Sequence, residues 1–485
     1  MKIYFTDYFE VSPEELDSYG AFNISLINDL PAFIDPFLLF NSNNSEYQDL
    51  HENIIKYVQF LRDESKVNNL EDGLIKTWYR FPEVKQNWLG YSKVGNKGSG
   101  LGEKFSRSLH KNLHYLFYNF GDERITKGSH LEKLCLIEDG IGRDNISDFV
   151  ANLIKGYLCQ YTQKFAEAHI KKAMIKSCPV SHVEFNYKTK SWATRNFNLP
   201  FLNGDYILLT PKDILTKDDE WINKSDMFKD FDNICSALPN DSLRAQVNNY
   251  FKSRLPEDPS KKELDAAKEE TFRKFSELID YYIKYKEDNG DEAISISEER
   301  IKEIQNIFID RVKELASTLS ENSFYEQSGN TYTSALKRIN FLKQVIENND
   351  GYRFFYVKGT PIKRESDLQL IFRLTWFASS YDVNSEVNNG RGPVDYKISK
   401  GARDSTLVEF KLASNSKLKS NLKHQVEIYE KANQTHKSIK VIMCFSLLEM
   451  QKVGKALKDL GLENREDIIL IDASRDNKDS ASNVR

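Results

Sequence analysis

Two short runs of alternating apolar and polar residues lie close together in the last quarter of this 485-residue chain. The first run is residues 394–398, VDYKI, and the second is residues 407–412, LVEFKL. Alternation with a period of two is typical of half-buried β-strands. The residues between them, 399–405, include Gly401 and favour a turn. The segment therefore predicts a β-hairpin with one apolar face and one polar face.

The register of this hairpin predicts that two carboxylates face each other. Asp395 and Glu409 are equally distant from Ala402, so a symmetric hairpin places them opposite, with Cβ atoms about 5 Å apart. Like charges at this distance repel unless a cation neutralises them. Glu409 and Lys411 are two residues apart and project from the same face. The pattern favours a site for a hard metal ion such as Mg²⁺; the alternative is a solvent-facing strand pair with an ordinary Glu409–Lys411 ion pair.

These residues resemble the active-site signature of a nuclease superfamily. Residues 393–395, PVD, and 408–411, VEFK, are similar to the PD-(D/E)xK signature, in which an acidic residue on one strand is followed by Asp/Glu-x-Lys on the next. Many restriction endonucleases and Holliday-junction resolvases belong to this superfamily. The inserted Val394 falls at a position that is loose in the family. The resemblance covers roughly residues 355–475 and is at the level of the superfamily.

The elements expected around the hairpin follow the same order as the restriction-endonuclease core. That core is an α/β arrangement with the order αβββαβ. The sequence predicts helices at 364–379, 417–433 and 447–460, and strands at 352–356, 383–387, 439–445 and 468–471, besides the hairpin.

The resemblance implies a Mg²⁺-dependent endonuclease in which Mn²⁺ substitutes for Mg²⁺. Asp395, Glu409 and the carbonyl of Phe410 are then expected to hold the metal, which polarises the phosphate and activates a water molecule. Lys411 is expected to orient or deprotonate that water and to stabilise negative charge.

Further site residues are implied by the family pattern. Gln425, on the helix after the second hairpin strand, and Glu365, at the start of the first helix, match positions that some members use. The alternatives are a surface amide for Gln425 and a favourable helix-start charge for Glu365. Contacts to the phosphate backbone are expected from Arg391, Lys417, Lys419 and Lys423.

The remaining chain is expected to form two further regions. Residues 1–235 predict a mixed α/β domain, which would act in sensing, specificity or oligomerisation. Residues 236–350 are rich in charged helix formers and predict a helical connector, followed by the nuclease domain at 351–475 and a disordered tail at 476–485.

Two motifs in the first region have open interpretations. The glycine-rich residues 95–102 precede a helix and predict either a flexible connector or a contact to phosphate. The acidic residues of the segment 140–148 predict either a helix capped by Asn145 or Ser147, or a second metal or ligand site.

Composition limits the compartment and the partners. The net charge is −4, so nucleic-acid binding would depend on a local basic patch. The five cysteines form no CxxC pair, which is typical of a reducing compartment. No apolar run approaches the roughly 20 residues that a membrane helix needs, and the N-terminus lacks the apolar core of a signal peptide. A cytoplasmic protein is expected.

The expected function is an endonuclease that cleaves nucleic acid, DNA rather than RNA, consistent with prokaryotic defence against foreign DNA. One alternative is a non-catalytic nucleic-acid-binding or regulatory protein with a nuclease-like fold. Another places the chemistry at the acidic segment 140–148.

We predict that the protein forms a homodimer through residues 1–350. Cutting both strands of a duplex needs two active sites, whereas one chain carries a single D…ExK signature, and C2 dimers are the commonest soluble assembly. Light scattering should give a dimer for the full chain and a monomer for the fragment 351–485. A monomeric full chain that still makes double-strand breaks would contradict this prediction.

Overall fold

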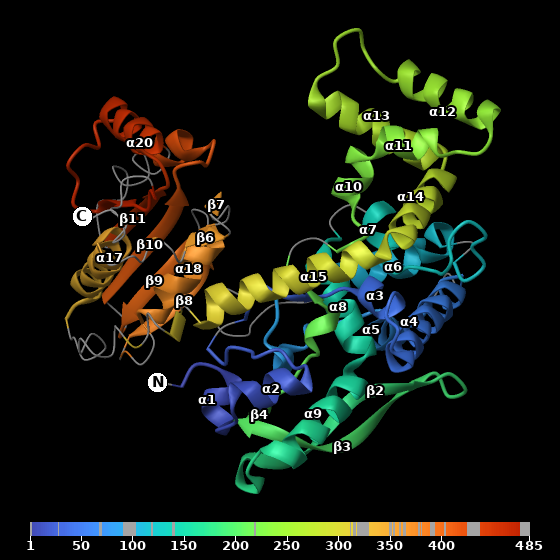
Figure 1. The fold of residues 1–485 in the computed structure, drawn as a ribbon, viewed down its shortest axis with the longest axis horizontal. Coiled ribbons are helices and arrows are strands. Elements are labelled where there is room, and N and C mark those ends of the chain that lie inside the picture. The colour runs from blue at the N-terminus through green and yellow to red at the C-terminus, as the bar shows by residue number, and fades with distance from the viewer. Residues whose placement is uncertain are drawn as a thin grey trace, which may run out of the picture. The chain divides into compact units, whose positions relative to one another are not determined.

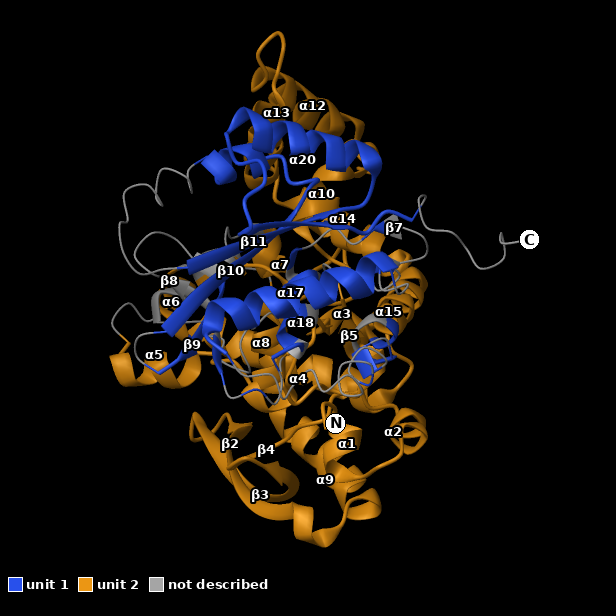
Figure 2. Cartoon of the chain, turned by 90° about the vertical axis from the view of Figure 1, so that its left-hand side faces the viewer, with its two compact units in different colours: residues 1, 93–95, 305–485 blue, residues 2–92, 96–304 orange. Residues whose placement is uncertain are grey.

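The computed structural model is a mixed α/β structure that divides into two compact units (Figures 1 and 2). Unit 2 comprises Lys2–Ser92 and Asn96–Ile304, and unit 1 comprises Gln305–Arg485. Within these units, the residues outside the described part are 1, 28, 67–69, 91–102, 118–119, 138–140, 218–219, 311, 314–316, 318–328, 349–351, 353–354, 358–359, 362–364, 377–378, 380, 389–392, 402–403, 424–436 and 476–485.

Unit 2 is mainly helical. Its helices are α1 (Phe5–Phe9), α2 (Pro13–Tyr19), α3 (Pro36–Phe40), α4 (Ser45–Glu64), α5 (Asp72–Trp78), η1 (Lys85–Asn87), α6 (Glu103–Leu116), α7 (Lys133–Ile137), α8 (Arg143–Leu153), α9 (Lys155–His169), η2 (Lys172–Met174), η3 (Lys212–Ile214), α10 (Lys224–Lys229), α11 (Phe231–Ser236), α12 (Asp241–Ser253), α13 (Lys261–Lys274), α14 (Glu277–Asp288) and α15 (Gly290–Ile304). Its strands are β1 (Phe33–Ile34), β2 (Ile175–Asn186), β3 (Ser191–Leu202), β4 (Asp205–Tyr206) and β5 (Leu215–Thr216). None of the helices in the described residues is long and apolar enough to cross a bilayer.

The long hairpin of β2 and β3 packs against helix α9 at a glycine. The register of the hairpin shifts between Ser181 and Glu184, where His182 has a left-handed φ of 59°. This bulge pushes the backbone toward α9, so that a Cβ atom on Gly156 would lie 2.3 Å from the carbonyl oxygen of Val183. Residue 156 must therefore lack a side chain.

We predict opposite effects for two helical glycines of unit 2. Gly156→Ala should lower the stability of unit 2 by about 1–3 kcal/mol, because the added methyl group overlaps the bulge of β2. Gly73→Ala on α5 should raise stability by about 0.5–1 kcal/mol, because a Cβ atom there meets nothing within 4 Å and alanine favours the helix. Urea unfolding followed by circular dichroism measures both changes. Equal midpoints for the two variants would contradict the packing described here.

Unit 1 is built around a five-stranded mixed sheet. Its elements are η4 (Gln305–Asp310), α17 (Thr331–Asn348), β6 (Tyr356–Val357), β7 (Thr360–Pro361), α18 (Glu365–Leu374), β8 (Asp382–Asn388), β9 (Pro393–Lys400), β10 (Asp404–Leu412), β11 (Lys437–Cys444), α20 (Leu447–Asp459) and β12 (Ile468–Asp472). The strand order is β12-β11-β10-β9-β8; β8, β9 and β10 are antiparallel neighbours, whereas β10, β11 and β12 run parallel. Residues 418–423 are helical and begin the predicted helix 417–433.

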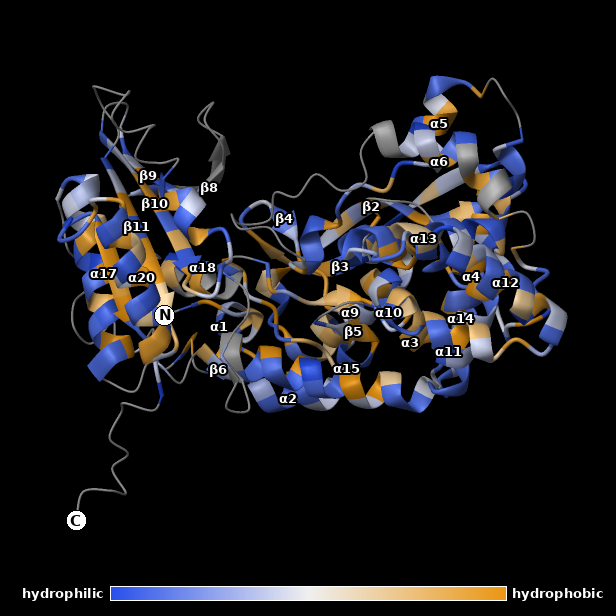
Figure 3. Ribbon diagram, turned by 90° about the horizontal axis from the view of Figure 1, so that it is seen from above, coloured by the Kyte–Doolittle hydropathy of each residue, from blue (hydrophilic) through white to orange (hydrophobic). Residues whose placement is uncertain are grey.

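Two apolar clusters cover the two faces of this sheet. On one face, helices α17 and α18 pack against buried side chains that include Tyr396, Val408 and Phe410. On the other face, α20 and residues 413–422 pack against Ile442 and Cys444 of β11. In Figure 3, β10 and β11 carry apolar (orange) segments, as expected for strands at the centre of a sheet.

Helix α17 belongs to the core of unit 1. Ile339 and Leu342 of this helix are buried in the first cluster, and Nε of Arg338 donates to the carbonyl of Thr375 beyond α18, at 2.9 Å. The predicted connector, residues 236–350, is thus divided between the two units, because the apolar face of α17 is needed to cover the sheet. A fragment that begins at residue 351 would lack helix α17 and would leave part of the sheet uncovered. The fragment 305–485 should therefore replace 351–485 in the light-scattering measurement.

Candidate functional site

The predicted hairpin and its register are confirmed. Strands β9 and β10 pair antiparallel from Asp404–Lys400 to Val408–Tyr396, and the next step in this register brings Glu409 opposite Asp395. An Asp395 carboxylate oxygen, Oδ2, accepts a hydrogen bond from the backbone N–H of Phe410 at 2.6 Å. The local alternation of the sequence therefore gives both the turn and the position of the two carboxylates.

Lys411 lies among acidic and carbonyl oxygens. Its Nζ atom is 3.2 Å from Oε2 of Glu365 and 3.8 Å from Oδ2 of Asp395, and it donates to the carbonyl of Phe410 at 2.9 Å. The Lys411 side chain is 20% exposed, so these interactions are only partly screened by water. Two of these three acceptors, Asp395 and the Phe410 carbonyl, are groups that the sequence predicts as metal ligands.

The charges around Lys411 determine its protonation. Burial alone lowers the pKa of Lys411, but the negative charges of Asp395, Glu365 and Glu409 outweigh this effect and hold the pKa above its ordinary value. Lys411 is therefore an ammonium ion at neutral pH. In this state it can orient a water molecule and stabilise negative charge, but it cannot accept a proton.

Glu365 links helix α18 to the end of β10. Oε1 of Glu365 accepts hydrogen bonds from the backbone N–H of Leu412 at 3.3 Å and from Nδ2 of Asn415 at 3.0 Å, while Oε2 contacts Lys411. The side chain thus bridges a strand, the loop after it and a helix that begins 46 residues earlier than Lys411. The structure thus brings Glu365 and Lys411 together, and it adds Asn415, which the sequence does not predict.

Lys440 is a second unpredicted residue near the site. It pairs with Glu409 in the β10–β11 register and is 7% exposed. Burial lowers the pKa of Lys440 to about 8, although the charges of Glu409 and Asp467 act in the opposite direction. Its signal in the sequence is that a single charged residue interrupts the apolar strand 439–445.

The donor set fits a hard divalent cation that retains water or phosphate ligands. Among the described residues, no three His, Cys, Asp or Glu side chains are gathered closely enough to hold a metal ion by themselves. However, Mg²⁺ commonly takes only one or two protein carboxylates and completes its shell with water and substrate oxygens. Asp395, Glu409 and the carbonyl of Phe410 provide such a set, and the ammonium of Lys411 is already bound beside them.

Of the five remaining predicted site residues, three lie within the described part of the chain. Gln425 and Arg391 lie outside the described residues. Lys417, just before the helical residues 418–423, and Lys423, the last of them, are both exposed. Lys419 forms an ion pair with Asp459 of α20 at 2.6 Å, which offsets part of its charge toward phosphate.

The acidic segment of unit 2 has structural partners. Helix α8 is preceded by Gly142 as N-cap; Asn145 accepts a hydrogen bond from the Gly142 N–H at 3.0 Å, and Ser147 accepts one from the N–H of Ile34 at 2.9 Å. Neither Asn145 nor Ser147 is therefore the N-cap. Burial, with the charges of Asp144 and Glu83, raises the pKa of Asp148 to about 8.

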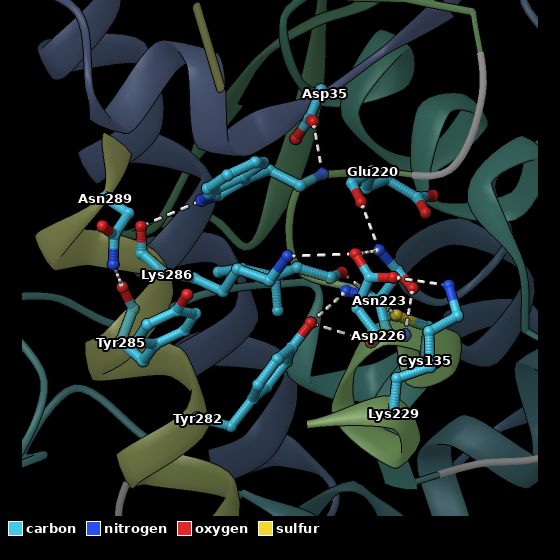
Figure 4. A network of polar contacts seen from close by, with 12 residues as sticks. Asp35, Cys135, Glu220, Asn223, Asp226, Lys229, Tyr282, Tyr285, Lys286 and Asn289 are labelled. Carbon is cyan, nitrogen blue, oxygen red and sulfur yellow. Dashed lines mark hydrogen bonds and ion pairs between the residues drawn. The ribbon is translucent and has the colours of Figure 1, made fainter. Parts of the chain in front are cut away.

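A polar network inside unit 2 fastens the segment before α10 to helix α14 (Figure 4). The Tyr282 hydroxyl donates to the carbonyl of Asn223 at 2.9 Å and accepts from the Asn223 N–H at 3.1 Å. Trp221 donates its indole N–H to the carbonyl of Lys286 at 2.9 Å and its backbone N–H to Asp35 at 2.9 Å. The polar groups named here have their hydrogen-bond partners within this network, which indicates a structural role.

Comparison with known proteins gives two matches, both to domains of unknown function. The DUF8370 model matches residues 10–223, within unit 2, and the DUF8371 model matches residues 331–447, within unit 1. The second match begins at the first residue of α17, in agreement with the packing of this helix on the sheet. No curated protein and no solved structure matches the chain.

We predict a pH-dependent loss of stability that arises from His51. This side chain is 2% exposed, beside His130, and burial with the His130 charge lowers its pKa to about 3. The unfolded chain takes up a proton on this histidine near pH 6.5, whereas the folded chain does not. Stability is therefore fully present above pH 6.5 and falls toward pH 3. By pH 5 the loss should reach up to about 2 kcal/mol.

Urea unfolding of the full chain at pH 7.5 and pH 5.0 measures this effect. In His51→Gln, the decline between the two pH values should be smaller than in the wild type. Parallel declines in both proteins would show that His51 does not contribute.

Proposed function

We propose that unit 1 is a Mg²⁺-dependent nuclease of the PD-(D/E)xK type. The observation that carries this proposal is the position of Lys411, whose Nζ lies 3.2 Å from Glu365 and 3.8 Å from Asp395, on the strand that also presents Glu409. Further support comes from the order of elements: α18, β8, β9, β10, the helix from residue 418 and β11 follow the αβββαβ order of the restriction-endonuclease core.

The acidic and basic side chains of the site have different roles. Asp395, Glu409 and the Phe410 carbonyl would hold Mg²⁺, and Mn²⁺ in its place; when bound, the metal supplies Lewis-acid activation of the phosphate and of water. Lys411 would orient the attacking water and offset the negative charge that develops on the phosphate during attack. Glu365 is a positioning residue, because it holds the Lys411 ammonium and the backbone of Leu412 in place.

The substrate would be nucleic acid, and DNA rather than RNA. Exposed Lys417 and Lys423 provide cations for the phosphate backbone on the helix after β10. Such contacts give affinity that does not depend on base sequence. A homodimer would supply the second active site for double-strand cleavage, and a role in prokaryotic defence against foreign DNA fits this arrangement.

We predict that removing one charge from the site abolishes cleavage while the fold is retained. Asp395→Asn and Lys411→Ala should each lower the rate by about 10²- to 10⁴-fold, because each removes transition-state stabilisation at a partly exposed position. Cleavage of plasmid DNA and of a structured RNA is followed with Mg²⁺, with Mn²⁺ and with EDTA. Circular dichroism should show unchanged secondary structure.

The matched control is Lys452→Ala, which removes a lysine from the exposed side of α20. It should cleave at the wild-type rate. Wild-type rates in both Asp395→Asn and Lys411→Ala would overturn the assignment of the site. Binding of nucleic acid without cleavage by the wild-type protein under all metal conditions would favour the non-catalytic alternative.

A further inference from the structure

A groove of about 530 Å³ lies in unit 2, between helices α5 and α6 and the C-terminal end of α4. Its lining includes the apolar side chains of Leu70 and Ile75 and the buried His110. The volume falls within the range of small-molecule sites. The residues that line the groove all belong to unit 2, whereas the D…ExK hairpin belongs to unit 1.

One wall of the groove carries a row of basic side chains. Arg107, His110, Lys111 and His114 of α6 all line it. Their spacing of three and four residues places them on one face of the helix. The glycine-rich residues 95–102, for which a contact to phosphate is one interpretation, precede α6 in the sequence and lie outside the described residues.

Negative charge in the groove is limited to one side chain. Asp72 is the only carboxylate among the described lining residues, and it pairs with Arg107 at 2.9 Å. Lys111 is exposed and pairs with no carboxylate in the described part of the chain. The groove therefore presents a surplus of positive charge beside an apolar wall.

We infer that this groove binds a nucleotide through its phosphate group. Guanidinium and ammonium groups are the side chains that bind phosphate best, Arg by paired hydrogen bonds and Lys as a point charge. The wall of Leu70 and Ile75 offers an apolar surface for the sugar and the base. The phosphate could belong to a free nucleotide or to the end of a nucleic-acid strand, since both present the same group.

This inference does not depend on nuclease activity. Its test is therefore a binding measurement in EDTA, with the full chain and a fluorescent mononucleotide as probe. Unlabelled mononucleotide, a short single-stranded oligonucleotide and inorganic phosphate serve as competitors. Lys111→Glu is the test variant, because Lys111 is exposed and its replacement should leave the fold intact. Lys164→Glu on α9 makes the same change of charge at an exposed position outside the groove and is the control.

Lys111→Glu should weaken binding at least tenfold and make the affinity less dependent on salt concentration. Lys164→Glu should bind as the wild type does. Competition by the mononucleotide indicates a free nucleotide as ligand, whereas competition by the oligonucleotide alone indicates a strand end; both support the groove. The inference is overturned if the wild type does not bind the probe or if Lys111→Glu binds unchanged. It is also overturned if a control variant is equally weakened, or if inorganic phosphate competes as well as the mononucleotide does.

Discussion

The position of β10 at the centre of a five-stranded sheet determines the organisation of unit 1. Because the strand is paired on both edges, its residues can only point to one face or the other. Val408, Phe410 and Leu412 enter the apolar cluster beneath α17 and α18, and Glu409 and Lys411 must then project from the opposite face. The same backbone geometry thus stabilises the core and positions the charged residues. A shift of the register by one residue would bury both charges and expose the apolar side chains.

The candidate site is built to hold positive charge. Carboxylates from β9, β10 and α18 surround one ammonium group, and this arrangement keeps Lys411 protonated. Removing a partner would leave charge in a partly buried place without compensation, which is costly. Lys440, which is buried on the neighbouring strand β11 opposite Glu409, is a second lysine that interacts with that carboxylate. The site is therefore a network that extends over more strands than the D…ExK signature contains.

The sequence predicts features that depend on neighbouring residues better than it predicts contacts between elements far apart in the chain. The hairpin, its register and its apolar face follow from alternation within about 20 residues, and Glu365 follows from the resemblance to a known superfamily. The contacts of Asn415 and Lys440 depend on how separate elements approach each other, which periodicity does not reveal. Helix α17 illustrates the same limit: its amphipathic pattern predicts a helix, but not that the partner of its apolar face is a sheet that follows it in the chain. For this reason the sequence predicts residues 236–350 as one connector.

Helix α17 and strand β12 are near the first and the last element of unit 1, and they pack together. Lys343 donates to the carbonyl of Leu470, and Glu347 accepts from the N–H of Asp472 at 2.8 Å. The α17 side of the core is thus completed by residues that lie some 125 positions later in the chain. During synthesis on the ribosome, α17 would therefore meet this partner only after residue 472 has emerged. The sheet between them, which carries Asp395, Glu409 and Lys411, would complete its packing only after β12 has been synthesised, well after these three residues.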